Sequence, residues 1–177
     1  WIGETASDNK FVSFNDGVGN PLPQIAIGRF PVTNTAQVDA IVSKIQSYEQ
    51  TPPAGDWRSR VSFISDNAYS ASGVMDSAGN FWAFNDEIAS DPTFLPGFYN
   101  RNRVYYNPCD SAIYPQCALP YPPYTTVGAT RDGILAAIND GSAIVHYVGH
   151  GWVTSWASES FFSTLDVNAL SNGGKLP

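Results

Sequence analysis

Short apolar runs alternate along this chain with segments whose apolar residues recur at helical spacing, and this alternation constrains the fold most strongly. The runs predict strands over 24–29, 60–65, 103–106 and 142–148. The helical pattern predicts helices over 34–49, 80–89 and 130–141, with a last helical turn over 167–171. Strands that alternate with helices at this spacing predict an α/β domain with a mainly parallel sheet.

Polar residues mark where the helices begin. Thr33 or Asn34 is expected to cap the first helix, Thr130 the third and Asp166 the last turn. Gly141 is expected to end the third helix, at a position where a left-handed residue is usual.

Length and charge exclude several classes of partner. The 177 residues suit one domain, or one domain with a remnant of another. Nine Lys and Arg stand against 16 Asp and Glu, a net charge of −7, so no basic patch for nucleic acid is expected. No apolar run approaches the roughly 20 residues that cross a bilayer, so no membrane span is expected.

The two cysteines, Cys109 and Cys117, share one proline- and tyrosine-rich loop. We expect a disulfide formed in an oxidising compartment, with free thiols as the alternative. No His or third Cys is near enough for a zinc site. Potential calcium ligands occur in the first loop but lack EF-hand spacing and are typical turn formers: Asp8, Asn15, Asp16 and Asn20. We therefore predict no cofactor and no metal at the site, and leave a structural calcium open.

His150 is the main candidate for chemistry, because it follows the run 142–148 and stands between Gly149 and Gly151. Ligand sites in parallel sheets form beyond the carboxyl ends of the strands, where Asp66 also falls after 60–65. His150 is expected to act as a general base, with the Gly151 N–H aimed at a developing oxyanion. The alternatives are a turn histidine without function and, for Asp66, a cap or turn residue.

Other polar residues near His150 receive weaker assignments. His146 lies within the same run and is predicted to be a hydrogen-bonded histidine of the sheet. Glu159 and Asp166 follow closely enough to orient the His150 ring, but each is more typical of a surface charge or a helix cap. The chain carries no Gly-x-Ser-x-Gly, His-Glu-x-x-His or phosphate-loop motif.

A resemblance to a known family is carried by residues 25–32, 41–49, 61–66, 130–151 and 166–177. Together these segments resemble the gingipain family of cysteine peptidases, a C25-like family. The resemblance runs in order through most of the chain and is strongest from Thr130 to Gly151.

The resemblance implies a caspase-like three-layer α/β/α fold with a mainly parallel sheet, incomplete at both ends. Residues 1–53 would be the end of a preceding subdomain, with a loop, a short strand and a helix. Residues 54–177 would be the catalytic subdomain without its cysteine strand. His150 would be the catalytic histidine and Gly151 would supply the oxyanion-hole N–H. The family's cysteine would lie beyond Pro177, and neither Cys109 nor Cys117 matches it.

The resemblance also implies a function. We expect a fragment of a secreted or cell-surface cysteine endopeptidase that acts on protein or peptide substrates, with the rest of its own precursor as a further partner. The isolated 177-residue chain is expected to be inactive. The first alternative is an inactive caspase-like scaffold for binding or secretion-system assembly. The second is an aromatic surface for sugar or protein, built from the five Trp and nine Tyr. Substrate preference and oligomeric state stay open.

Overall fold

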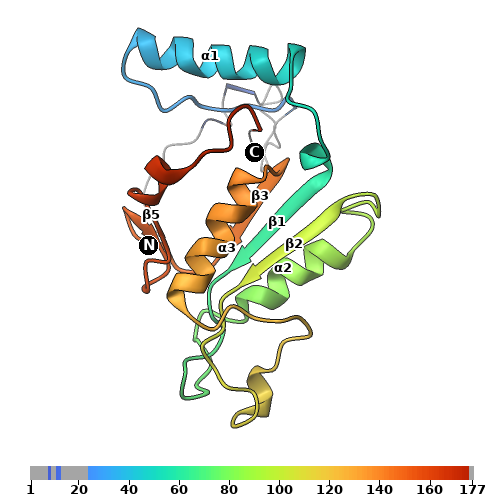
Figure 1. Ribbon diagram of the computed structural model, residues 1–177, viewed down its shortest axis with the longest axis vertical. Helices are drawn as coiled ribbons and strands as arrows, with labels where there is room; N and C mark the ends of the chain where they lie inside the picture. Colours follow the sequence, from blue (N-terminus) through green and yellow to red (C-terminus); the bar gives the residue numbers. More distant parts are fainter. Residues whose placement is uncertain (1–7, 9–10, 13–23, 176–177) are drawn as a thin grey trace, which may run out of the picture. The chain divides into compact units, whose positions relative to one another are not determined.

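The computed structural model describes residues 8, 11–12 and 24–175, which fall into two compact units divided between Gln46 and Ser47. The second unit is built on a three-stranded parallel sheet with the order β2-β1-β3 (Figure 1). Its strands are β1 (Arg60–Ser65), β2 (Asn100–Tyr105) and β3 (Ile144–Val148). The predicted α/β class with a parallel sheet is confirmed.

The central strand β1 is buried on both faces, which explains its apolar sequence. Val61 and Phe63 point to one side, and Ile64 belongs to the cluster on the other. The pairing with β2 aligns Arg60 with Asn100, so β2 begins three residues before the predicted apolar run. The strand predicted over 142–148 begins at Ile144.

Helices cover the two faces and produce three layers. Helix α2 (Phe81–Ser90) packs on the face with Val61 and Phe63. Helix α3 (Val127–Asn139) packs on the face with Ile64, where Phe161 completes the core. Phe161 directly precedes β5 (Phe162–Ser163), which pairs antiparallel with β4 (Ser155–Trp156). The expected α/β/α layering is therefore present in the second unit.

The described residues also contain helix α1 and short 3-10 turns. Helix α1 spans Thr35–Gln50, and Asn34 Oδ1 accepts a hydrogen bond from the Gln37 N–H at 3.0 Å, so Asn34 is the cap. Among the 3-10 turns are η2 (Trp57–Ser59), η3 (Pro115–Cys117) and η4 (Asp166–Ala169). No helix in the described ranges combines the length and apolar character that a bilayer span needs.

Three local predictions are wrong. The strand predicted over 24–29 is absent, because no neighbouring segment among the described residues offers these residues a ladder of hydrogen bonds. Helix α3 begins one turn early: Thr126 is its cap and accepts from the Ala129 N–H at 3.2 Å, while Thr130 is buried inside the helix. Asp166 lies within η4 instead of capping it, since its carboxylate faces back to the Ser163 N–H. Gly141 does have a positive φ, +90°, as expected.

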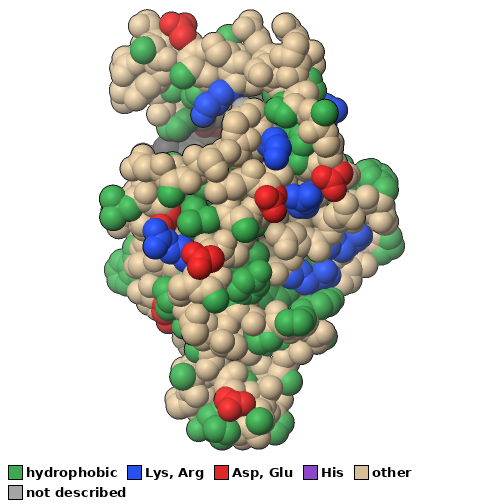
Figure 2. Space-filling model, viewed as in Figure 1, with side chains coloured by type: hydrophobic (Ala, Val, Ile, Leu, Met, Phe, Trp, Pro, Cys, Tyr) green, Lys and Arg blue, Asp and Glu red, His purple; other side chains and the backbone are tan. Residues whose placement is uncertain are grey.

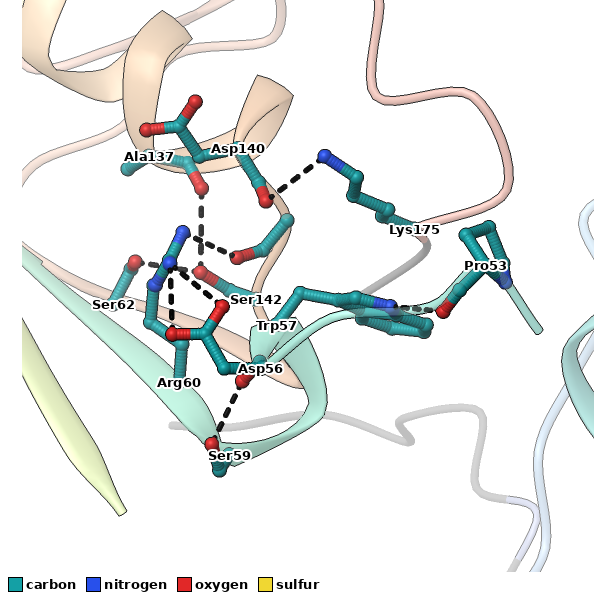
Figure 3. Close-up of polar contacts among 11 residues, drawn as sticks. Pro53, Asp56, Trp57, Ser59, Arg60, Ser62, Ala137, Asp140, Ser142 and Lys175 are labelled. Atoms are coloured by element: carbon teal, nitrogen blue, oxygen red, sulfur yellow. Dashed lines mark hydrogen bonds and ion pairs between the residues drawn. The ribbon is translucent and has the colours of Figure 1, made fainter.

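The amino-terminal end of the sheet is fixed by a polar network (Figure 3). The hydroxyls of Ser62 and Ser142 lie 2.8 Å apart and are buried. Arg60 donates to the Gly141 carbonyl at 3.3 Å, and Trp57 donates to the Pro53 carbonyl at 2.9 Å. These contacts hold β1 against the turn that enters β3 and leave the opposite, carboxyl end of the sheet for the site.

On the face shown in Figure 2, some of the basic side chains lie next to acidic ones. The ion pairs of the described residues include Arg60 with Asp56 and Arg131 with Asp166. Arg103 pairs with Asp86 at 2.8 Å and its guanidinium stacks on Tyr121. The guanidinium groups of Arg60, Arg103 and Arg131 thus form ion pairs within the folded chain.

Candidate active site

The parallel pairing of β1 with β3 brings Asp66 and His150 to the same edge of the sheet. Ser65 is aligned with Val148, so the residues that follow the two strands emerge side by side. Nδ1 of His150 lies 3.0 Å from Asp66 Oδ2, and the His150 backbone N–H donates to the same oxygen at 3.1 Å. A carboxylate at this position accepts from Nδ1–H and so assigns Nε2 as the basic nitrogen.

Asp66 is a fixed carboxylate. Its side chain is 2% exposed, and Oδ1 accepts from the Asn67 N–H at 2.8 Å. Burial raises the pKa of Asp66, and the hydrogen bonds from His150 and Asn67 oppose that rise. Its two oxygens therefore receive three donors, which hold the carboxylate in one orientation.

The His150 backbone is held as firmly as its ring. Its carbonyl accepts from the Tyr147 hydroxyl at 2.6 Å and from the Ala157 N–H at 2.7 Å. The ring packs edge-on against Phe81, with the centroids 5.1 Å apart, and the side chain remains 44% exposed. One imidazole nitrogen is thus anchored while the ring stays accessible.

Asp76 is a site residue that the sequence did not reveal. Its Oδ1 lies 3.7 Å from Nε2 of His150. Asp76 lies on the hairpin 68–76, which follows β1 and closes through the bond from the Asp76 N–H to the Ala68 carbonyl at 2.8 Å. No local pattern marks this aspartate among other turn residues, because its place depends on how the hairpin folds back.

A cavity of about 410 Å³ opens beside the histidine. Among the residues that the structure describes, three carboxylates reach it, those of Asp66, Asp76 and Glu159, and no Lys or Arg lines it. Glu159 is exposed and accepts from the Ser158 hydroxyl at 2.9 Å, so it lines the cavity without orienting the ring. The described residues that line the cavity are Asp66, Asn67, Asp76, His150, Gly151, Trp152, Ser158 and Glu159.

The two glycines beside His150 differ. A Cβ at Gly149 would overlap Cβ of Asp66 and the hydroxyl of Tyr147, so only glycine fits. A Cβ at Gly151 would meet nothing within 4 Å. Neither glycine has a positive φ. The Gly151 N–H makes no hydrogen bond with any residue that the structure describes.

His146 is the hydrogen-bonded sheet histidine that its sequence position predicts. Its Nδ1 lies 2.7 Å from Oδ1 of Asn85, a fully buried residue of α2. The Asn85 amide donates to the Ile64 carbonyl at 2.7 Å, and the His146 ring packs edge-on against Phe63. His146 thus links α2 to the sheet.

The predicted disulfide between Cys109 and Cys117 is confirmed, and both residues are buried. No free cysteine occurs within the described ranges. Asp8 pairs with Arg29, while Asn15, Asp16 and Asn20 lie outside the described residues. In the part of the chain that is described, no group of three His, Cys, Asp or Glu side chains is arranged to hold a metal.

These features define the class of domain: three α/β/α layers with a carboxylate-anchored histidine at the carboxyl edge of a parallel sheet. The family model of Peptidase family C25 matches residues 3–177. This chain therefore belongs to peptidase family C25, the cysteine peptidase family that its sequence resembles.

Curated relatives and solved structures agree with this assignment. Gingipain R2 of Porphyromonas gingivalis is 42% identical over 50 residues, 28% of this chain and 7% of that protein. Gingipain R1 of the same species is 42% identical over the same length, 5% of that protein.

The crystal structure of the Arg specific cysteine proteinase gingipain R shares 22% identity at a TM-score of 0.62, covering 97% of this chain and 34% of that one. The complex of the RgpB pro- and mature domains matches at a TM-score of 0.62 and 21% identity, over 98% of this chain and 35% of that one. The chain thus spans about a third of the solved structures, which share its caspase-like fold.

Proposed function

We propose that this chain supplies the histidine half of a cysteine endopeptidase site. One observation carries the proposal: His150 has Nδ1 bound to buried Asp66 while its ring stays exposed beside the acidic cavity. This is the arrangement that a general acid–base needs, because the anchored nitrogen fixes the tautomer and leaves Nε2 for proton transfer.

The reaction requires a thiol from outside this chain, since Cys109 and Cys117 are joined to each other. Nε2 of His150 accepts the thiol proton, and the thiolate attacks the scissile carbonyl carbon. As the tetrahedral intermediate collapses, Nε2–H gives that proton to the leaving amine and the acyl-enzyme forms. Water then attacks the thioester, Nε2 takes its proton and returns it to the sulfur, and the acid product leaves.

The Gly151 N–H is the proposed oxyanion donor within this chain. It lies directly after His150, lines the cavity and has no partner among the described residues. An unpaired N–H at that place is available to a developing negative charge. The absence of a side chain at Gly151 also leaves room for the substrate backbone.

The charge of the cavity favours a basic substrate side chain. Asp76 and Glu159 add negative charge to a lining whose described residues include no Lys or Arg. A guanidinium or ammonium group gains from opposite charge in such a partly enclosed cavity. The description of the structural neighbour as Arg specific agrees with this choice. We propose a peptide with Arg or Lys next to the scissile bond as the substrate.

The disulfide and the relatives support proposals for the location of the protein and for a partner. A disulfide persists in oxidising surroundings, so we propose a secreted or cell-surface location. The neighbouring structure of RgpB pro- and mature domains suggests a segment of the protein's own precursor as a partner.

The test uses the full-length protein and peptides with Arg, Lys or a neutral residue at the cleavage site. His150→Ala is expected to lower kcat/KM by at least ~10³-fold. His146→Gln, a change in the other histidine, serves as the matched control once circular dichroism shows that it is folded. A wild-type protein without hydrolysis would favour the inactive scaffold, and undiminished hydrolysis by His150→Ala would remove His150 from the mechanism.

The isolated 177-residue chain provides a second test. It is expected to hydrolyse none of these peptides, because neither of its cysteines is a free thiol. Hydrolysis by the purified chain that is lost in His150→Ala would show that the nucleophile lies within it.

A further inference from the structure

The disulfide loop has a rigid base at the end of β2. Asn107 donates through its side-chain amide to the Cys117 carbonyl at 2.9 Å and accepts from the Cys109 N–H at 3.3 Å. The Asn107 N–H donates to the Tyr124 carbonyl at 2.9 Å. The cross-link and these bonds hold both ends of the segment 109–117, which restricts the residues between them.

Two side chains of this loop reach the tip of the hairpin 68–76. The Tyr114 ring lies against Gly73, where an added Cβ would stand 2.6 Å from Cδ1 of the ring. Gln116 Nε2 donates to the Gly73 carbonyl at 3.2 Å. Gly73 has a φ of +74°, so both the backbone conformation and the close packing require glycine. Figure 1 shows both segments beyond the carboxyl ends of β1 and β2.

The hairpin connects this tip to Asp76. Ser70 N–H donates to the Val74 carbonyl at 2.9 Å, and Asp76 N–H donates to the Ala68 carbonyl at 2.8 Å. Asp76 is three residues from Gly73, and its Oδ1 faces Nε2 of His150 at 3.7 Å. A single two-stranded hairpin is marginally stable in water, so this one needs support from outside.

We propose that the disulfide loop is a brace that positions Asp76 opposite His150, with Tyr114 and Gln116 as positioning residues that act through Gly73. The consequence for Asp76 as a substrate-binding carboxylate rests on the proposed function. The brace itself depends only on the contacts between the loop and the hairpin.

Burial of both cysteines fits this role. Cys109 is 5% exposed and Cys117 1% exposed. Thiol–disulfide exchange requires a thiolate to reach a sulfur, so shielded sulfurs exchange slowly. The brace is therefore expected to stay closed in the mild reductant that keeps a nucleophilic thiol active.

Hydrogen exchange tests the brace directly. In Tyr114→Ala and in the double variant Cys109→Ser, Cys117→Ser, the amides of Ser70, Gly73 and Asp76 are expected to exchange about tenfold faster than in the wild type. Tyr114→Phe keeps the ring and is expected to restore wild-type exchange. The matched control is Ser111→Ala, at an exposed position of the same loop. Unchanged exchange of these amides in both Tyr114→Ala and the double cysteine variant would overturn the proposal.

Kinetics of the full-length protein test the link to Asp76. For a peptide with Arg at the cleavage site, Tyr114→Ala is expected to lower kcat/KM about fivefold, mainly through KM. When Tyr114→Ala is added to a protein that already carries Asp76→Asn, it should lower kcat/KM no further. Equal losses in the two backgrounds would show that the loop does not act through Asp76.

A third measurement separates this proposal from the proposed function. The ring nitrogen resonances of His150 are expected to move in Tyr114→Ala in the direction that they move in Asp76→Asn, whether or not the protein hydrolyses peptides. If hydrolysis is absent and these shifts occur, the peptidase proposal fails and the brace stands. If the resonances stay in place in Tyr114→Ala while Asp76→Asn moves them, the brace does not position Asp76.

Discussion

Two stretches of chain meet at His150 and differ in how they are packed. On the enclosed side, β3 is half-buried, His146 bonds to Asn85, and Gly149 lies so close to Asp66 that no side chain fits. On the other side, Gly151 borders open space and Val153 is fully exposed. The enclosed side fixes where the imidazole stands, and the open side leaves room for a ligand.

The comparison shows that two glycines in one short motif serve different physical purposes. Gly149 is required by the approach of Asp66 and Tyr147, which is a property of the folded protein itself. Gly151 is required by neither space nor backbone conformation. Its role under the proposed function is to present a backbone N–H and to admit substrate.

The largest effect on stability is expected from Gly149→Ala. The new methyl would overlap Asp66 and Tyr147, and overpacking of this kind costs about 2–3 kcal/mol of the free energy of unfolding. Urea unfolding measures this loss. A change below about 0.5 kcal/mol would mean that the enclosed side is looser than the structure indicates.

A smaller loss is expected from His146→Ala. The change leaves Oδ1 of buried Asn85 without its partner, and an unsatisfied buried acceptor costs about 1–3 kcal/mol. The double variant His146→Ala, Asn85→Ala should lose less than the sum of the single changes, since the pair shares one interaction. Additive losses in urea unfolding would contradict the coupling.

Asp66→Asn is expected to change how stability depends on pH. Burial raises the pKa of Asp66 above its usual 3.8, so the folded state holds a proton that the unfolded state releases first. The stabilisation of the folded state by this proton is complete below pH 3.8 and is lost as the pH rises through the raised pKa. The free energy of unfolding then changes by at most about 1.4 kcal/mol per pH unit. The free energy of unfolding, measured from pH 3 upward, should decline less steeply with pH in Asp66→Asn than in the wild type. Parallel curves would contradict this assignment.

Gly151→Ala is expected to have the smallest effect on stability, within about 0.5 kcal/mol, because the methyl enters open space. Under the proposed function the same methyl obstructs the substrate beside the oxyanion donor and lowers kcat/KM by about tenfold or more. Urea unfolding and peptide hydrolysis by the full-length protein measure the two effects. A Gly151→Ala protein that is fully active would show that the open side is not where substrate lies.

Much of the local structure follows from the sequence. The apolar run 60–65 gave β1 at its observed bounds, and Asn34 was one of two caps expected for α1. The cysteine spacing predicted the disulfide, since the two residues share one short loop. The strand expected over 24–29 failed because apolar residues supply only the pattern of a strand, and its hydrogen bonds need a neighbour.

The sequence by itself determined the order of α1, β1, α2, β2, α3 and β3, the disulfide and the place of His150 after a strand, because each depends on neighbours in the chain. Only the tertiary structure decided that Asp66 binds Nδ1, that Asp76 faces Nε2 and that Gly149 and Gly151 have different surroundings. These facts join residues up to 84 positions apart, through the parallel register of β1 with β3 and the fold of the hairpin 68–76. Such contacts are set by packing between segments, which local patterns do not encode.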